Sequence, residues 1–154
     1  MEKPLLLKPH HLLDIIRDFG AGKKHQPHPY GHDVHRVAEI IRKNPHTLVE
    51  FTSAADDICA PCRKLCDGTC TDTTDSPGKT VSKEVYNRTI DRRIFTRLGL
   101  REGATLSVLE FCRLAGRKLG DLYSIYREVD PEKTKGRGKN LSRGLKEYIE
   151  SASD

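Results

Sequence analysis

Four cysteines grouped within twelve residues are the side chains of this chain best suited to chemistry. In a reducing compartment, thiols clustered in this way more often bind metal than form disulfides. A spacing of two residues lets two sulfur atoms reach one ion from a single tight turn, and Gly68 lets the backbone fold back toward that turn. The pattern predicts a metal site, and its spacing is Cys59-x2-Cys62-x3-Cys66-x3-Cys70.

The compactness of this segment bears on the kind of metal. Tetrahedral zinc usually takes two cysteine pairs separated by a longer stretch, whereas a compact run suits an iron–sulfur cluster. The sequence therefore favours iron–sulfur, with a 4Fe–4S cluster first and zinc as the alternative. Two interpretations without metal stay open: the thiols pack as small apolar groups, or they form a reversible disulfide that acts as a redox switch. Cys112 follows Phe111 in a predicted helix, and we expect it in the core.

Histidines form a second group of candidate ligands and proton carriers, because all seven lie in the first 46 residues. With an ordinary pKa of about 6.5, a histidine transfers protons at neutral pH or ligates metal as the neutral ring. His10 and His11 open a predicted helix, and His10 is a candidate metal ligand. His32 and His35 are three residues apart at the start of another helix and are expected to face one point. The candidate catalytic residues are thus His32, His35 and His11, and the competing interpretation is a solvated, pH-sensitive surface.

The net charge of +5 is unevenly distributed along the chain. Residues 1–77 carry 10 basic and 11 acidic side chains, whereas residues 78–154 carry 17 and 11. Arg88, Arg92 and Arg93 step along one predicted helix and would bind a phosphate or carboxylate if they converged, the alternative being a solvated helix face. Nucleic acid is not favoured as a partner, because aromatic residues are not interleaved with the positive charges.

The elements that must position these residues are mainly helical. A chain of 154 residues is enough for one compact domain, and its helices have sequence signals at their ends. Pro9 suits a first helical turn, Ser82 an N-cap and Gly99 a helix stop. Ser107 and Glu110 fit the capping-box pattern, in which each side chain accepts a hydrogen bond from the other's backbone N–H.

The sequence thus predicts a small single-domain helical metalloprotein, mainly α with one or two short strands. We divide it into a metal-binding helical domain, residues 1–130, and a basic C-terminal tail with a short helix, residues 131–154. No apolar run is long enough for a membrane helix and no secretory signal is recognisable, so we expect no membrane association and a cytoplasmic location. The predicted elements are helices over 9–20, 33–43, 82–98, 107–120, 122–129 and 141–149, a strand over 47–53, loops over 21–31 and 72–80, and a freely moving stretch over 132–140.

Several motifs accompany the cysteine segment. They are Pro9-His10-His11-Leu12, Pro29-Tyr30-Gly31, Asp-Asp-Ile-Cys-x2-Cys-x7-Cys over residues 56–70, and Leu98-Gly99-Leu100. With these motifs the chain resembles, over roughly residues 4–115, a family of small bacterial and archaeal proteins of unknown function, domain of unknown function 1284, which are suspected of binding iron–sulfur. The chain departs from the family pattern by having Cys66 inside the x7 gap and a basic tail in place of further cysteines.

The resemblance implies a cluster held by Cys59, Cys62 and Cys70 and leaves the fourth position to another group. We expect Cys66 or His10 in that position. Four cysteine ligands would give a saturated cluster for electron transfer, sensing or structure, and a redox partner. Three would leave an iron with an open site, a Lewis acid for a small-molecule substrate with histidine assistance. The sequence leaves open whether the protein is an enzyme. The alternatives are a zinc-stabilised module that contacts nucleic acid or an acidic partner, and the thiol redox switch.

Overall fold

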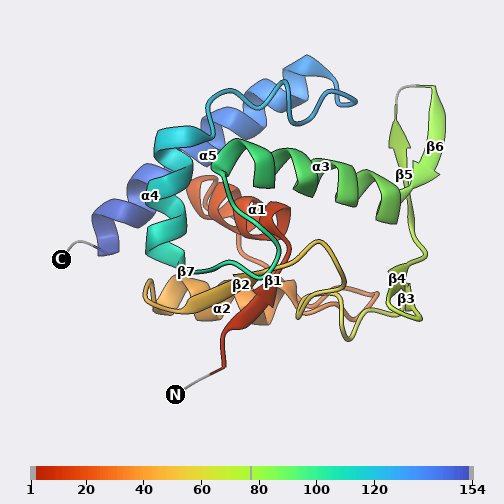
Figure 1. The fold of residues 1–154 in the computed structure, drawn as a ribbon, viewed down its shortest axis with the longest axis horizontal. Helices are drawn as coiled ribbons and strands as arrows, with labels where there is room; N and C mark the ends of the chain where they lie inside the picture. Colours follow the sequence, from red (N-terminus) through yellow and green to blue (C-terminus); the bar gives the residue numbers. More distant parts are fainter. Residues whose placement is uncertain (1–2, 77, 153–154) are drawn as a thin grey trace.

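A computed structural model of the chain describes residues 3–76 and 78–152 (Figure 1). Over these residues the fold is mainly helical with short strands, as the sequence predicts. The helices are α1 (Pro9–Gly20), α2 (Val34–Lys43), α3 (Lys83–Leu98), α4 (Val108–Lys118) and α5 (Pro131–Ala152). The strands are β1 (Leu5–Leu7), β2 (Leu48–Phe51), β3 (Leu65–Cys66), β4 (Thr69–Cys70), β5 (Thr73–Ser76), β6 (Lys79–Ser82) and β7 (Thr105–Ser107).

The helix-end signals at Pro9, Ser82, Gly99 and Ser107 are confirmed. Pro9 is the first residue of α1, where its missing N–H would have no intrahelical partner. The Ser82 hydroxyl accepts a hydrogen bond from the Val85 N–H at the start of α3, and Gly99 ends that helix with a φ of 69°. The capping box between Ser107 and Glu110 is present at the start of α4.

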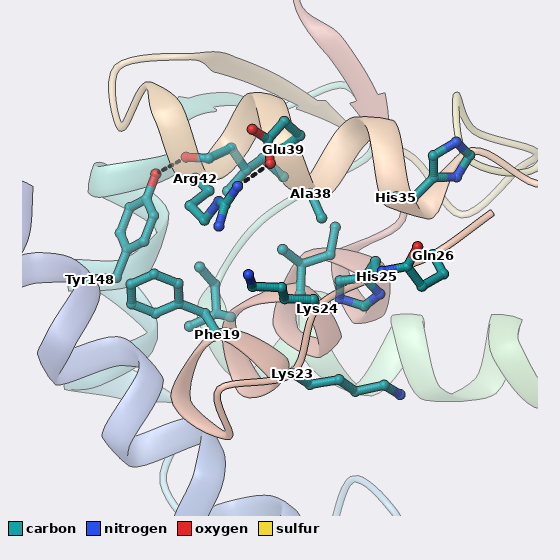
Figure 2. Close-up of a pocket in the computed structure, with 13 residues that line it drawn as sticks. Phe19, Lys23, Lys24, His25, Gln26, His35, Ala38, Glu39, Arg42 and Tyr148 are labelled. Atoms are coloured by element: carbon teal, nitrogen blue, oxygen red, sulfur yellow. Dashed lines mark hydrogen bonds and ion pairs between the residues drawn. The ribbon is translucent and has the colours of Figure 1, made fainter.

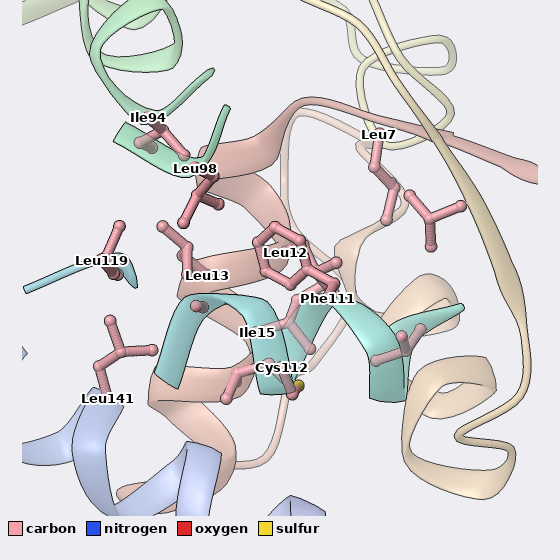
Figure 3. Packing of buried hydrophobic residues seen from close by; sticks show 14 of the residues in the cluster. Leu7, Leu12, Leu13, Ile15, Ile94, Leu98, Phe111, Cys112, Leu119 and Leu141 are labelled. Atoms are coloured by element: carbon pink, nitrogen blue, oxygen red, sulfur yellow. The ribbon is translucent and has the colours of Figure 1, made fainter. Parts of the chain in front are cut away.

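Helix α1 lies in the middle of the molecule and supplies much of the core (Figure 1). It packs most extensively against α5 and also contacts α3. Figure 3 shows its Leu12 and Leu13 beside Phe111 and Cys112 of α4, all four of them buried. The prediction that Cys112 is a core residue is therefore confirmed. Because both ends of α1 are held by this packing, the histidines at its start have fixed positions.

A small sheet brings the start of α1 next to the cysteine segment. Its strand order is β1-β2-β7, with β1 parallel to β2 and β2 antiparallel to β7. In β2, Val49 and Phe51 are buried whereas Leu48 and Glu50 are exposed, the alternation of a strand with one face in the core. Beyond β2, the Asp57 N–H donates to the carbonyl oxygen of Leu6 at 2.9 Å. The segment that carries the cysteines is thereby tied to β1.

The loop predicted over residues 72–80 is wrong in its described part, which forms the β5–β6 hairpin. Residue 77 lies outside the described residues. The hairpin projects from the start of α3 away from the helical body (Figure 1). Its strands bury little, so they lack the apolar alternation by which a strand is recognised in a sequence.

Two further expectations near the C-terminus are wrong. Residues 122–129 form separate turns, with Leu122, Ile125 and Tyr126 buried, where a helix is predicted. Residues 132–140, predicted to move freely, belong to α5, which is one helix of 22 residues in place of a short one. The Arg137 guanidinium fixes this stretch by an ion pair of 2.8 Å to Asp14 and by its place over the Tyr126 ring. No helix among the described residues has the length and apolarity needed to cross a bilayer.

Candidate metal centre

A cavity of about 600 Å³ lies where α1, the 21–33 loop, the cysteine segment and the start of α3 meet. We call it the cysteine–histidine cavity. Three of the four clustered cysteines and four histidines line it, and they come from stretches far apart in the sequence. These residues are Cys59, Cys62, Cys70, His11, His25, His28 and His32.

Asp56 fixes the turn on which the first cysteine lies. Its carboxylate accepts hydrogen bonds from the N–H groups of Ile58 and Cys59, at 3.1 and 3.0 Å, and from that of Lys8 at 2.8 Å. It also bonds Nδ1 of His11 at 2.6 Å. Burial alone would raise the pKa of Asp56, but His11 and the backbone N–H groups hold it far below its usual range. The carboxylate is therefore an anion that joins the cysteine turn to the start of α1.

The bond to Asp56 determines which nitrogen of His11 is left for a ligand. Because Nδ1 bonds the carboxylate, Nε2 is the ring nitrogen that this bond leaves free, and His11 lines the cavity. A carboxylate in this position orients a metal-binding imidazole and raises its basicity. Among the described residues, one group of three His, Cys, Asp or Glu side chains has ligand atoms within 4.8 Å of one another, namely His11, Asp56 and Cys59.

The three cavity-lining cysteines are held by different contacts. The Cys59 thiol is half-buried, and its burial together with the charge of Asp56 raises its pKa to about 12. The Cys62 N–H donates to the Cys59 carbonyl at 2.9 Å, which closes the tight turn expected from the spacing. The Cys70 N–H donates to Oε1 of Glu84, a buried residue of α3, at 3.0 Å. These sulfur atoms line one cavity without forming a group as compact as His11, Asp56 and Cys59.

Cys66 is placed differently from the other clustered cysteines. It lies on the β3–β4 hairpin, it is exposed, and it is not among the residues that line the cavity. The turn of this hairpin has positive φ angles at Asp67 and Gly68, of 50° and 77°. Gly68 thus reverses the chain, as expected, and pairs Cys70 with Leu65 while Cys66 pairs with Thr69.

The 21–33 loop covers the cysteine segment. The Asp33 N–H donates to the Ile58 carbonyl at 3.0 Å, and the Arg63 N–H donates to the Tyr30 carbonyl at 2.7 Å. The Lys64 ammonium lies 4.9 Å from the centre of the Tyr30 ring. These contacts hold the histidines of the loop against the cysteines.

His32 is the loop histidine with the strongest sign of a missing partner. Its Nδ1 atom is buried and has no hydrogen-bond partner among the described residues. Its ring stacks on that of His28 with centroids 4.2 Å apart. Burial, followed by the nearby His28 and His11, lowers the pKa of His32 below its ordinary value, so that the neutral ring, the form that binds metal, is favoured.

The other candidate histidines lie elsewhere. His10 is buried, and its Nδ1 and backbone N–H both bond the carboxylate of Asp91 on α3, each at 2.9 Å. His35 lines a second pocket of about 170 Å³ between α1, α2 and α5. Figure 2 shows His35 at one end of this pocket, and Phe19 and Tyr148 at the other. The structure thus places His32 and His35 at different cavities.

The candidate anion-binding arginines are placed along α3. Arg88 donates to Glu84 at 3.0 Å, and Arg93 makes a two-bond ion pair with Glu128 on the 119–130 connection. Arg92 is exposed. Two of the three therefore have carboxylate partners within the chain, an arrangement that fits the solvated-face interpretation.

Two residues of the cavity region have no functional signal in the sequence. Lys8 lines the cavity although it follows a short apolar run, and Glu84 anchors Cys70 although it looks like an ordinary first-turn carboxylate of α3. Asp56 begins the Asp-Asp-Ile-Cys motif, but its bond to His11, 45 residues earlier, depends on the tertiary fold.

Comparison with known proteins identifies a family. The model of a family described as "Protein of unknown function (DUF1284)" matches residues 28–126. The match includes the whole cysteine segment, His28 and His32, and it begins after His11. No curated protein and no solved structure matches the chain.

Proposed function

Because this chain belongs to the DUF1284 family, whose function is unknown, we propose a function from the cysteine–histidine cavity: the protein binds a metal centre there. The observation that carries the proposal is the meeting of Cys59, Cys62, Cys70 and His11 around one cavity. The buried, unpartnered Nδ1 of His32 in the same cavity supports it independently. Such a nitrogen atom is costly to leave without a partner.

An iron–sulfur cluster is the centre that this donor set fits best. Thiolates are the ordinary ligands of such clusters, and each thiolate binds a different iron. Ligand sulfurs of a cluster therefore lie farther apart than those around one ion, in keeping with three cysteines that share a cavity without close convergence. We propose Cys59, Cys62 and Cys70 as the three thiolate ligands.

His11 is our choice for the fourth ligand. The bond to Asp56 fixes the ring and leaves Nε2 free of that contact, and the ligand atoms of His11 and Cys59 lie within 4.8 Å of each other. Cys66 lies on an exposed hairpin outside the cavity, and His10 is bonded to Asp91. When bound, a cluster with a single histidine ligand supplies electron transfer or, if that ligand is displaced by substrate, Lewis acidity. His32 would then hold or release a proton at Nδ1.

A single zinc ion is the second candidate, and one observation favours it. The ligand atoms of His11, Asp56 and Cys59 are close enough together to meet around one ion. Against it, the Asp56 carboxylate is already used by three backbone N–H groups and His11, so that binding a metal would break some of these bonds.

The test is a set of serine variants purified without oxygen. Cys59→Ser, Cys62→Ser and Cys70→Ser should each lose most of the visible absorbance and the bound iron, whereas Cys66→Ser keeps both. Cys66→Ser is the matched control, since it removes a thiol from the same segment. Equal loss of absorbance and iron in all four variants would contradict the ligand assignment. A colourless wild-type protein with one zinc ion per chain would show that the bound metal is zinc and that no iron–sulfur cluster is present.

A further inference from the structure

Lys8 is a buried cation beside the cysteine–histidine cavity. It links β1 to α1, its residue is only 1% exposed, and it lines the cavity. Among the residues that the structure describes, no carboxylate lies within ion-pair distance of its ammonium group, and none hydrogen-bonds to it. A lysine side chain that is so little exposed is unfavourable unless an anion balances its charge, and such groups are ordinarily paired. Its charge also lowers the pKa of Cys59, although burial and Asp56 outweigh it.

The rest of the cavity lining is also cationic. Six lysine or arginine side chains line it against three aspartates, an excess of three positive charges. Arg17 pairs with two of these aspartates, and Lys83 lies 3.4 Å from the third. The lysines that remain without a carboxylate among the described residues are Lys8, Lys23, Lys24 and Lys64. A cavity with this balance attracts anions.

The size of the cavity leaves room for a molecule beside a metal centre. About 600 Å³ is within the range of sites that hold small organic ligands. Three thiolates would balance the lining charge, but the iron–sulfur core that they bind carries a small net positive charge of its own. Net positive charge therefore remains in the cavity and can be balanced by a further anion.

From the burial of Lys8, the lining charge and the cavity volume, we propose that the cavity binds a small oxyanion, a carboxylate or a phosphate, whose charge is held by the Lys8 ammonium. This inference rests on the proposed function, because it places the anion beside the metal centre. It names the chemical class of ligand that the centre meets. Lys8 is then a binding residue for that ligand, and the exposed Lys23 and Lys24 guide anions toward the opening.

The experiment is calorimetric titration of the metal-loaded protein with inorganic phosphate, with succinate, and with the uncharged succinamide. We expect one of the two anions to bind with a stoichiometry of one, and succinamide not to bind. Binding of phosphate alone assigns a phosphate ligand, and binding of succinate alone assigns a carboxylate. Failure of both anions to bind overturns the inference, because Lys8 would then serve only the charge of the thiolate-ligated centre.

Two variants localise the binding. Lys8→Met keeps the length and burial of the side chain and should weaken anion binding at least tenfold, whereas Lys3→Met, an exposed lysine nearby, should leave it within twofold. Lys8→Arg, which keeps the charge, should bind more tightly than Lys8→Met, and Lys8→Gln, which also removes the charge and should lose the same affinity, serves if Lys8→Met does not fold. Unchanged affinity in a folded Lys8→Met overturns the inference. Metal analysis of the same samples separates the two proposals, since loss of metal from the wild type counts against the proposed function, and intact metal without anion binding counts against the inference alone.

Discussion

Asp56 shows how a single buried side chain can hold a site together. Its two oxygens accept hydrogen bonds from three backbone N–H groups and bond the ring of His11. The relative positions of the cysteine turn, β1 and α1 therefore depend on one carboxylate. Hydrogen bonds to a charged group are stronger than neutral ones, particularly where water is excluded. Asp56 therefore acts on the site by positioning Cys59 and His11.

Replacement of this carboxylate tests that role. Asp56→Asn should lower the free energy of unfolding by about 2–4 kcal/mol, because an amide cannot accept all four bonds and leaves buried donors unpaired. Chemical denaturation of the metal-free protein measures this. Asp75→Asn, on the exposed β5–β6 hairpin, is the matched control and should change stability by less than about 0.5 kcal/mol. Equal stabilities of the two variants would show that Asp56 does not join these segments.

The five thiols should differ in reactivity according to their surroundings. Cys66 is exposed and should be alkylated quickly in the native protein, whereas burial of Cys112 raises its pKa to about 12 and should leave it unmodified until the chain unfolds. In the metal-loaded protein, Cys59, Cys62 and Cys70 should be protected as well. Mass spectrometry of peptides after brief alkylation reads out each site. Protection of Cys66 together with the other three would contradict its place outside the metal centre.

At the scale of elements, the contact between α1 and α5 is unusually close. A Cβ atom added at Gly144 would meet the backbone carbonyl of Ile16, and one added at Gly20 would meet backbone atoms of Asn140 and Gly144. The two helices therefore touch by their backbones, and this contact helps to hold α1 in the position that presents His10 and His11. The glycines of α5 are part of the packing.

Gly144→Ala should destabilise the protein by about 1–3 kcal/mol, since the helices must separate, although alanine is the better helix former by about 1 kcal/mol. Gly138→Ala is the matched control in the same helix. An added Cβ meets nothing within 4 Å there, so this variant should be more stable than wild type by about 0.5–1 kcal/mol. Thermal unfolding of both variants decides the matter, and a stabilised Gly144→Ala would contradict the close approach of α1 and α5.

The elements that local signals define could be predicted from the sequence. Apolar periodicity and the caps at Pro9, Ser82 and Ser107 locate α1, α3 and α4. α5 was predicted too short, because Gly136 and Gly138 look like helix breakers and the contacts of Arg137 that hold the stretch are tertiary. β1 and β7 have only three residues each and exist through their pairing with β2.

The candidate site could be predicted only in part, because local spacing defines some of its residues and tertiary packing defines the others. The cysteine spacing identifies the segment, but whether a given cysteine or histidine reaches the cavity depends on packing. Cys66 and Cys70 lie on the two strands of one hairpin, and Cys70 lines the cavity whereas Cys66 does not. His10 bonds Asp91, whereas His11 bonds Asp56. Lys8 and Glu84 acquire their roles only when β1 and α3 are brought to the cysteine turn.

On the scale of the whole molecule, the cavity joins four separate stretches of the chain, so its contents should affect the stability of the entire fold. If the free ligand is present at about one hundred times its Kd, binding of the metal centre would add ~2.7 kcal/mol to the free energy of unfolding. For a domain of this size that corresponds to a rise in Tm of about 5–10 °C. Calorimetry of the protein before and after anaerobic removal of the metal measures the difference. An unchanged Tm would show that the centre does not bridge these stretches.

The amount of iron and acid-labile sulfide in protein freshly isolated without oxygen decides whether the cysteine–histidine cavity holds an iron–sulfur cluster. We expect iron and sulfide in equal amounts, close to four of each per chain for a 4Fe–4S cluster, together with visible absorbance that disappears in Cys70→Ser and persists in Cys66→Ser. Protein that contains neither metal nor sulfide, with the thiols of Cys59, Cys62 and Cys70 free to react, would contradict it.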